Sequence, residues 1–292
     1  MKYLVVGVAA VSLLSACGGS GGGSNNSTGL SELVSFVEDG SADGTYSASG
    51  MGVSTHYVTN ADGTVTSVES PVSDRNVDAS LTFEDGELDA VSVETPDGTL
   101  SFSRSAGDTF ILQEGAITAV SADGDRVMVA ADPFQQGYEY QSYGTWQTGL
   151  TGTTRLAGAG SIGARTSASQ MPSSGTASYY GDSTGQVFTD GDVAVTTSYI
   201  AVDTDFDTVE VYSSETITAD PITGVITGSR PDLDFYAEGS VSGTGFAATM
   251  DTGTLTGTVD GQFYGPDAAE VGGTFSGTTA DSTYIGAFGA IQ

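Results

Sequence analysis

The stretch Gly-Gln-Phe-Tyr-Gly-Pro-Asp-Ala-Ala-Glu-Val-Gly-Gly-Thr-Phe, residues 261–275, decides the fold that we expect for this chain. The residues before it, 254–263, alternate small or polar side chains with bulkier ones, which predicts a strand whose two faces differ. Gly265 and Pro266 then end this strand, because proline has no N–H to donate to a sheet ladder. The stretch therefore begins with a strand that stops abruptly.

The second half of the stretch predicts a turn and a return strand. Asp267 is suited to cap one helical turn, and Glu270 lies three residues later, at the spacing of a capping box. Gly272 and Gly273 are expected to reverse the chain into a strand that starts at Thr274. None of these residues is poised for chemistry, so we interpret the stretch as a structural corner between two strands.

Strand signals extend along most of the chain. Asp-Gly pairs, which favour hairpin turns, occur at 39–40, 43–44, 62–63, 85–86, 97–98 and 123–124. Alternating segments around these pairs predict strands from residue 45 to residue 130, after a short helix at 30–37 capped by Ser31. Many further short strands are expected from 175 to 291. This pattern predicts an all-β protein, and closure into a barrel would remove the sheet edges.

The middle of the chain marks a change. Residues 132–137 interrupt the strand pattern, and the alternating aromatic stretch 138–147 that follows carries Trp146, which we interpret as a core anchor. Residues 149–173 are rich in Gly, Ser, Thr and Ala and predict a long loop. We therefore expect a sheet domain at 30–136 and a barrel domain at 137–292.

The corner carries a resemblance to a known family. The residues concerned are Gly261, Phe263, Tyr264, Gly265, Pro266, Glu270, Gly272, Gly273 and Phe275, followed by Gly-Ala-Phe-Gly-Ala at 286–290. They closely resemble the end of the β-barrel domain in the transferrin-binding protein B family, which consists of surface lipoproteins of Gram-negative bacteria. Residues 175–181 resemble an early barrel strand of the same family. The resemblance implies a C-terminal eight-stranded antiparallel β-barrel preceded by a sheet-rich "handle" domain.

The start of the chain predicts export and lipidation. Residues 1–16 combine Lys2 with an apolar run too short to span a bilayer, and Leu-Ser-Ala-Cys at 14–17 matches a bacterial lipobox. Cleavage before Cys17 would leave this cysteine as an acylated, palmitate-bearing N-terminus. The Gly- and Ser-rich residues 17–29 predict a flexible tether. We expect a lipid-anchored, surface-exposed protein of the outer membrane.

Composition restricts the possible partners. Without Lys2 the chain keeps six arginines against 37 acidic residues, a formal charge of −31. Such a surface repels nucleic acid and anionic lipid, since phosphate binding depends on Lys and Arg. The charge suits either solubility or a basic protein ligand.

Composition also restricts the chemistry. The chain after Lys2 has no lysine for a Schiff base, and its single histidine, His56, cannot make a multi-histidine metal site. Asp203-Thr-Asp-Phe-Asp207 alternates acids like a calcium loop but lacks the glycine and glutamate of that motif, so a turn is the preferred interpretation. We predict no enzyme activity, no catalytic, cofactor-binding or metal-ligating residue, and no cofactor.

The resemblance implies a function as well as a fold. Family members use loops of the handle and barrel to capture a host iron-carrying protein and pass it to an outer-membrane receptor, and related members bind haem-containing proteins. The iron-piracy members have two lobes, each a handle plus a barrel, whereas this chain has one such set. The implied partners are a protein or iron- or haem-carrying ligand and an outer-membrane receptor. The alternative is a structural or adhesive surface lipoprotein with no transport role.

Overall fold

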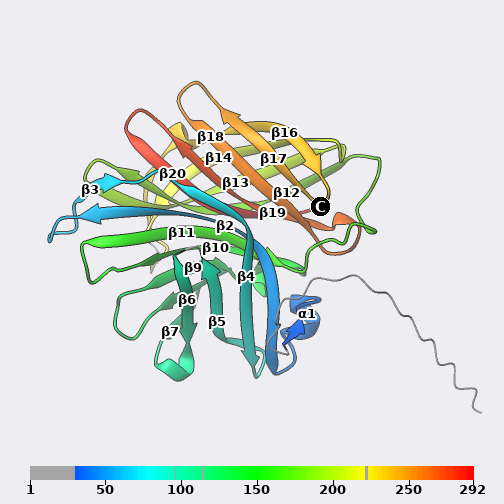
Figure 1. The fold of residues 1–292 in the computed structure, drawn as a ribbon, viewed down its shortest axis with the longest axis horizontal. Coiled ribbons are helices and arrows are strands. Elements are labelled where there is room, and N and C mark those ends of the chain that lie inside the picture. The colour runs from blue at the N-terminus through cyan, green and yellow to red at the C-terminus, as the bar shows by residue number, and fades with distance from the viewer. Residues whose placement is uncertain (1–29, 96, 114, 221–222) are drawn as a thin grey trace, which may run out of the picture.

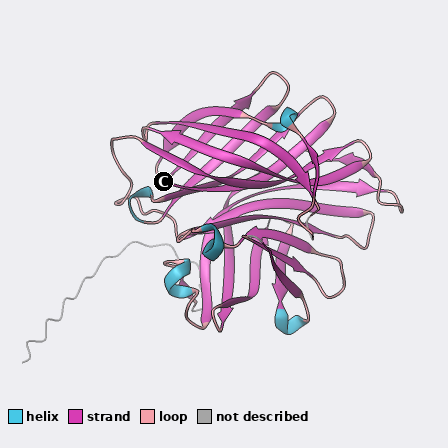
Figure 2. Ribbon diagram, turned by 180° about the vertical axis from the view of Figure 1, so that it is seen from behind, coloured by secondary structure: helices cyan, strands magenta, loops and turns pink. Residues whose placement is uncertain are grey.

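The computed structural model describes residues 30–95, 97–113, 115–220 and 223–292. These residues form two sheets, antiparallel except for one short parallel pair at residues 31–32, and the barrel strands lie above the handle strands in Figure 1. Seen from behind, strands account for nearly all regular structure and the helices are single turns (Figure 2). No helix in the described part of the chain is long and apolar enough to cross a membrane. The predicted all-β fold class is confirmed.

The first sheet, called the handle here, contains the strands before residue 164. They are β1 (Ser31–Glu32), β2 (Gly44–Thr59), β3 (Val65–Val68), β4 (Val72–Glu84), β5 (Glu87–Thr95), β6 (Gly98–Ser103), β7 (Thr109–Gln113), β8 (Ala116–Val120), β9 (Val127–Ala131), β10 (Gln141–Thr148) and β11 (Thr154–Gly163). Their order is β6-β5-β4-β2-β11-β10-β9-β8-β7, with β1 and β3 pairing with β2. Strands β6 and β7 are therefore the two free edges of this sheet. The sheet is curved, and one apolar cluster on its inner face contains residues from both halves of the strand order.

The second sheet is a closed barrel. It contains β12 (Ala177–Thr189), β13 (Asp192–Thr204), β14 (Thr208–Ala219), β15 (Ile226–Ser229), β16 (Tyr236–Ser242), β17 (Gly245–Asp251), β18 (Thr256–Tyr264), β19 (Glu270–Thr278) and β20 (Ser282–Ile291). Eight of these strands form a ring, because β13 pairs with both β12 and β14, while β15 is an extra strand on β14. The predicted eight-stranded barrel is confirmed.

Short helical turns connect the strands. They are α1 (Phe36–Asp39), α2 (Pro133–Gln136) and the 3-10 turns at Arg104–Ala106, Pro231–Leu233 and Pro266–Ala268. The helix expected at 30–37 is thus wrong in its position. Ser35 is the N-cap, since its side chain accepts hydrogen bonds from the N–H groups of Val37 and Glu38, and Ser31 lies in β1 instead.

The loop expected at 149–173 is also wrong in part, because it contains strand β11. The sparse side chains of β11 have a packing function: a Cβ on Gly158 would lie 2.3 Å from the indole of Trp146, its partner on β10. Trp146 is buried in the handle core and needs this space, as the sequence predicted for a core anchor. Strands β10 and β11 pair within the handle, so the change of sheet falls between residues 163 and 177. We propose to place the domain boundary there, later than the expected residue 137.

Three apolar clusters hold the molecule together. The barrel interior contains Phe246, Phe263 and Phe275, each at most 1% exposed. The handle interior contains Phe83, Phe102 and Trp146 among others. A third cluster lies between the sheets, where handle residues such as Tyr57 and Tyr143 meet barrel residues such as Phe188 and Ile285. Since this junction is itself a core, the two sheets are packed as one body.

Candidate functional site

The corner at 261–275 fastens the barrel to the handle. Tyr264 is fully buried, and its hydroxyl donates to the carbonyl of Ser161 on β11 at 3.1 Å. The N–H of Gly265 donates to the carbonyl of Ala164, and the hydroxyl of Thr166 donates to the carbonyl of Gly265. The corner therefore has a structural role, in line with the interpretation from the sequence, but its contacts reach the other sheet.

Glu270 is part of the same attachment. Its carboxylate accepts hydrogen bonds from the backbone N–H of Glu139 at 2.6 Å and of Tyr140 at 3.1 Å. Burial raises the pKa of Glu270 to about 7, against the lowering effect of these N–H donors. The capping box expected with Asp267 is wrong: the 3-10 turn has no side-chain cap, and Glu270 bonds to the handle segment instead.

The glycines of the corner make room for larger side chains. A Cβ on Gly261 would lie 2.0 Å from the ring of Phe246, and one on Gly265 would lie 2.3 Å from the ring of Tyr140. Gly265 also has a φ of 73°, which residues with a side chain rarely adopt. The expected chain reversal at Gly272 and Gly273 is wrong, because both lie inside β19 and the reversal occurs at 265–269. Phe263 and Phe275 lie in the barrel core.

The remaining residues singled out by the sequence do not converge on a reactive site. Cys17 lies outside the described residues, so its lipidation stays a prediction. His56 lies 3.6 Å from Asp97 and 3.8 Å from Glu69, and Ser54 hydrogen-bonds to Asp97 rather than to His56. A Ser-His-Asp relay needs the histidine between the other two groups, and this arrangement lacks that order.

The suspected calcium loop is a turn between β13 and β14. One oxygen of Asp205 accepts hydrogen bonds from the N–H groups of Asp207 and Thr208 and from the Thr208 hydroxyl, and these bonds lower the pKa of Asp205. Within the described residues, no three His, Cys, Asp or Glu side chains are placed to hold a metal ion.

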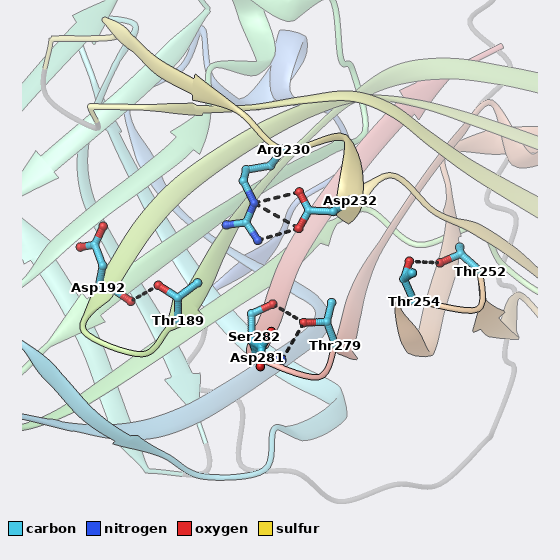
Figure 3. A network of polar contacts seen from close by, with 9 residues as sticks. All are labelled: Thr189, Asp192, Arg230, Asp232, Thr252, Thr254, Thr279, Asp281 and Ser282. Atoms are coloured by element: carbon cyan, nitrogen blue, oxygen red, sulfur yellow. Dashed lines mark hydrogen bonds and ion pairs between the residues drawn. The ribbon is translucent and has the colours of Figure 1, made fainter.

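One rim of the barrel shows how its polar groups are used (Figure 3). Arg230 pairs with Asp232 at 2.8 Å, Thr279 contacts Ser282 at 2.8 Å, and Thr252 contacts Thr254 at 3.3 Å. Each contact closes its own loop, and the labelled carboxylates of Figure 3 stand on different loops. Paired acids for glycoside-type chemistry would have to face one another across a cleft. The polar contacts of this rim therefore stabilise individual loops and do not form a shared site.

The handle interior contains an apolar cavity of about 120 Å³. Its lining includes Phe83, Phe110, Met128 and Trp146, and Arg104 lies at its margin over the ring of Phe110. Pockets for drug-sized ligands have volumes of roughly 300–1,000 Å³. The handle cavity is therefore too small for a large organic cofactor.

A much larger groove lies between the two sheets. It has a volume of about 1380 Å³ and is lined by β7 to β9 of the handle and by β12 to β15 of the barrel. Its walls carry the carboxylates of Asp182, Glu215, Asp220 and Asp234, and none of the described residues that line it is an arginine. Burial raises the pKa of Asp182. The groove exceeds the usual size of a small-molecule pocket, so it is suited to a protein segment.

No signal in the sequence identified this groove. Its handle and barrel walls come from separate parts of the chain, residues 113–143 and 182–234, and it exists only because the handle packs against the outside of the barrel. Ordinary Thr, Ser and Val positions of strands make up most of its walls. Because the sequence contains 37 acidic residues, the four that line the groove in the described part of the chain could not be distinguished from the rest.

Comparison with known proteins supports the family suggested by the corner. Residues 171–292 match the family described as the C-lobe and N-lobe beta barrels of Tf-binding protein B. No curated protein matches the sequence.

Solved structures of similar shape are distant in sequence. A variant of transferrin-binding protein B from Haemophilus parasuis Hp5 is 18% identical, with a TM-score of 0.48, over 82% of this chain and 51% of that one. The haemoglobin receptor HpuA from Kingella denitrificans is 13% identical, with a TM-score of 0.42, over 90% and 93% of the two chains. Transferrin-binding protein B from Neisseria meningitidis is 15% identical, with a TM-score of 0.41, over 75% and 52%. This chain spans about half the length of the transferrin-binding structures.

The evidence for the family is the sequence match of residues 171–292, rather than these distant similarities of shape. It includes the corner from which the resemblance was drawn, and it coincides with the closed eight-stranded ring. The predicted resemblance is thereby confirmed for the barrel: residues 171–292 of this chain match the β-barrels of transferrin-binding protein B.

Proposed function

We propose that this chain is a non-enzymatic, lipid-anchored binding protein on the surface of the outer membrane. In this proposal it captures an iron- or haem-carrying protein and delivers it to an outer-membrane receptor. The single observation that carries the proposal is the groove of about 1380 Å³ between the handle and the barrel. A groove of this size favours a protein ligand over a small molecule.

The arrangement of the sheets supports a binding role. The barrel is closed and its core is packed with aromatic side chains, so it can present loops and groove walls without moving. The junction cluster and the contacts of Tyr264 and Glu270 hold the two walls of the groove at a fixed distance. A preorganised groove loses little conformational entropy on binding.

The predicted anchor supports the proposed location. Acylation at Cys17, followed by the tether at 17–29, would hold the described body away from the membrane surface. The charge of the chain would repel anionic lipid, which leaves the lipid anchor as the membrane contact.

The nature of the ligand is taken from the comparisons. HpuA of Kingella denitrificans is described as a haemoglobin receptor and was solved in complex with human haemoglobin, and the transferrin-binding proteins are named for transferrin. We propose the same broad class of ligand for this chain, namely a host protein that carries iron or haem.

The test uses the detergent-solubilised full chain immobilised on a biosensor. Human haemoglobin and transferrin are offered with and without their iron or haem, and serum albumin serves as the control. The proposal expects saturable binding of one carrier and a growth defect of the deletion strain when this carrier is the sole iron source. Absence of binding, together with unchanged growth and loss of surface adhesion, would support the structural or adhesive alternative.

A further inference from the structure

A row of tyrosines crosses the outer face of the barrel. Tyr180 on β12 pairs with Ala201 on β13, which pairs with Tyr212 on β14, which in turn pairs with Tyr236 on β16. Neighbouring strands lie about 4.8 Å apart, so these positions follow one another across four strands. Tyr180 is 64% exposed and Tyr212 is 38% exposed. Large aromatic side chains left in solvent on one sheet face are typical of protein interfaces.

A row of carboxylates runs beside the tyrosines. Asp203 on β13 pairs with Glu210 on β14, which pairs with Glu238 on β16. Like charges directly opposite one another on a sheet are destabilising. The chain gives this row no arginine partner: Arg75, Arg104 and Arg230 pair with Asp260, Glu87 and Asp232 instead. Arg126 stacks on Phe102, while Arg155 and Arg165 donate to backbone carbonyls.

The two rows are connected by hydrogen bonds. The Tyr212 hydroxyl donates to one oxygen of Glu210 at 2.7 Å, and the Tyr236 hydroxyl donates to the other oxygen at 3.0 Å. The two rings lie 5.0 Å apart at their centroids. These bonds raise the pKa of both tyrosines and fix the ring faces next to the carboxylates. The face is thus ordered before any partner binds.

This face continues into the groove. Tyr199 on β13 is 60% exposed, pairs with Asp182 on β12, and lines the groove together with it. One surface therefore leads from the carboxylate row, across the tyrosines, to the cleft against the handle. We call it the tyrosine–carboxylate face.

We propose that the tyrosine–carboxylate face is the docking surface for a protein partner that presents arginine or lysine side chains. A guanidinium stacks on a tyrosine ring and at the same time pairs with a neighbouring carboxylate, and alternating rows of the two groups offer both contacts. Binding there would also remove the like-charge repulsion within the carboxylate row. The inference rests on the proposed function, because it gives the charge and the contact surface of the captured protein.

Two pairs of substitutions with the same change in net charge test the face. Glu210→Gln with Glu238→Gln removes two charges from the face, and Asp78→Asn with Glu84→Gln removes two exposed charges from β4 of the handle. A third variant, Tyr180→Ser with Tyr199→Ser, removes exposed rings that have no part in the barrel core. The probes are a short arginine-containing peptide and the same peptide with citrulline, which keeps the shape and lacks the charge.

Backbone amide shifts of the isotope-labelled full chain report the binding. We expect the arginine peptide to shift amides of β13, β14 and β16, and the citrulline peptide to leave them unchanged. Both face variants should bind the arginine peptide with an affinity lower by about fivefold or more, whereas the affinity of the β4 variant should stay within about twofold of that of the parent chain. Equal weakening by the β4 variant, shifts spread over the whole surface, or no binding by the parent chain would overturn the inference.

The same variants separate this inference from the proposed function. A chain that captures a carrier protein equally well with and without the face substitutions keeps the proposed function and refutes the tyrosine–carboxylate face as its docking surface. A chain that binds the arginine peptide at the face but captures no iron- or haem-carrying protein retains a cation-selective face and refutes the proposed function.

Discussion

The barrel and the handle are built from similar strands but differ in closure. The barrel ring has no free edge except through the added strand β15, and its interior is filled by phenylalanines and tyrosines that are nearly inaccessible. The handle is an open curl with two free edges, β6 and β7, and it retains a cavity of about 120 Å³. Closure therefore gives the barrel a tightly packed core, while the open handle leaves space within its core.

This difference has a functional consequence. Strand edges with unpaired N–H and C=O groups are templates for added strands, and closure removes them. The groove lies between the β8 and β9 part of the handle and the wall of the barrel, and of the described residues of the edge strand β7 only Gln113 lines it. We infer that the barrel supplies rigidity and the handle supplies adaptability, and the following predictions test this contrast from the largest expected effect to the smallest.

The largest contrast is expected from adding one methyl group to a crowded glycine in each sheet. Gly261→Ala places a Cβ 2.0 Å from Phe246 in the filled barrel, and Gly158→Ala places one 2.3 Å from Trp146, which borders the handle cavity. The free energy of unfolding of the barrel variant should fall by about 3 kcal/mol or more. That of the handle variant should fall less, because Trp146 has space to shift. Urea unfolding measures both, with Gly152→Ala as the control, since its Cβ would make only ordinary contacts. Equal losses would contradict the contrast.

The junction between the sheets should show a pH dependence through Glu270. Its pKa in the folded protein is raised to about 7 from an ordinary 4.5, so the folded state holds a proton that the unfolded state has already released. Stability should fall by about 3 kcal/mol as the pH rises from 4.5 to 7, and the contribution should level off above 7. Glu270→Gln should lack this part of the decline. Unfolding free energies at successive pH values give the slope, and an unchanged slope in the variant would refute the assignment.

Enlarging one valine in each core compares the packing directly. Val259→Leu adds a methylene to the barrel interior, where the side chain is fully buried, and should cost about 1–3 kcal/mol. Val91→Leu adds the same group beside the handle cavity and should cost less than about 1 kcal/mol. Thermal unfolding of the two variants measures the difference. A costlier substitution in the handle would show that the cavity is unable to accept the added group.

The smallest effect is expected for an ion pair that bridges the sheets. Arg75 on β4 pairs with Asp260 on β18, and the arginine side chain is 55% exposed. Arg75→Gln should lower the free energy of unfolding by less than about 1 kcal/mol, because exposed ion pairs are weak. Added salt should reduce this difference between the variant and the parent chain, because salt screens the pair. Arg104→Gln, which breaks a pair inside the handle, is the matched control. A loss that persists in high salt would point to a packing role for Arg75.

Local signals in the sequence predicted much of the fold. Asp-Gly pairs at 62–63, 85–86, 97–98 and 123–124 lie at hairpin turns, where the glycine of each pair has the positive φ that the turn requires. The pair at 39–40 instead ends helix α1, since a helix end and a hairpin turn accept the same residues. Short-range patterns thus located the strands well and distinguished poorly between kinds of turn.

Long-range contacts explain what the sequence did not predict. Strand β11 has too little apolar mass to be recognised, and only its pairing with Trp146 on β10 shows why small residues are needed there. Glu270 has the spacing of a cap, yet its partners lie about 130 residues away in the chain. The groove and the tyrosine–carboxylate face arise from strand register and sheet packing, which periodicity alone does not specify.

Amide hydrogen exchange of the full chain tests the contrast between barrel and handle most directly. Exchange through local opening reports the stability of each strand separately. The account predicts that β18, β19 and β20 of the barrel exchange slowest, close to the global free energy of unfolding, and that β6 and β7 exchange orders of magnitude faster. Equal protection of the handle edges and the barrel strands would contradict the division into a rigid barrel and an adaptable handle.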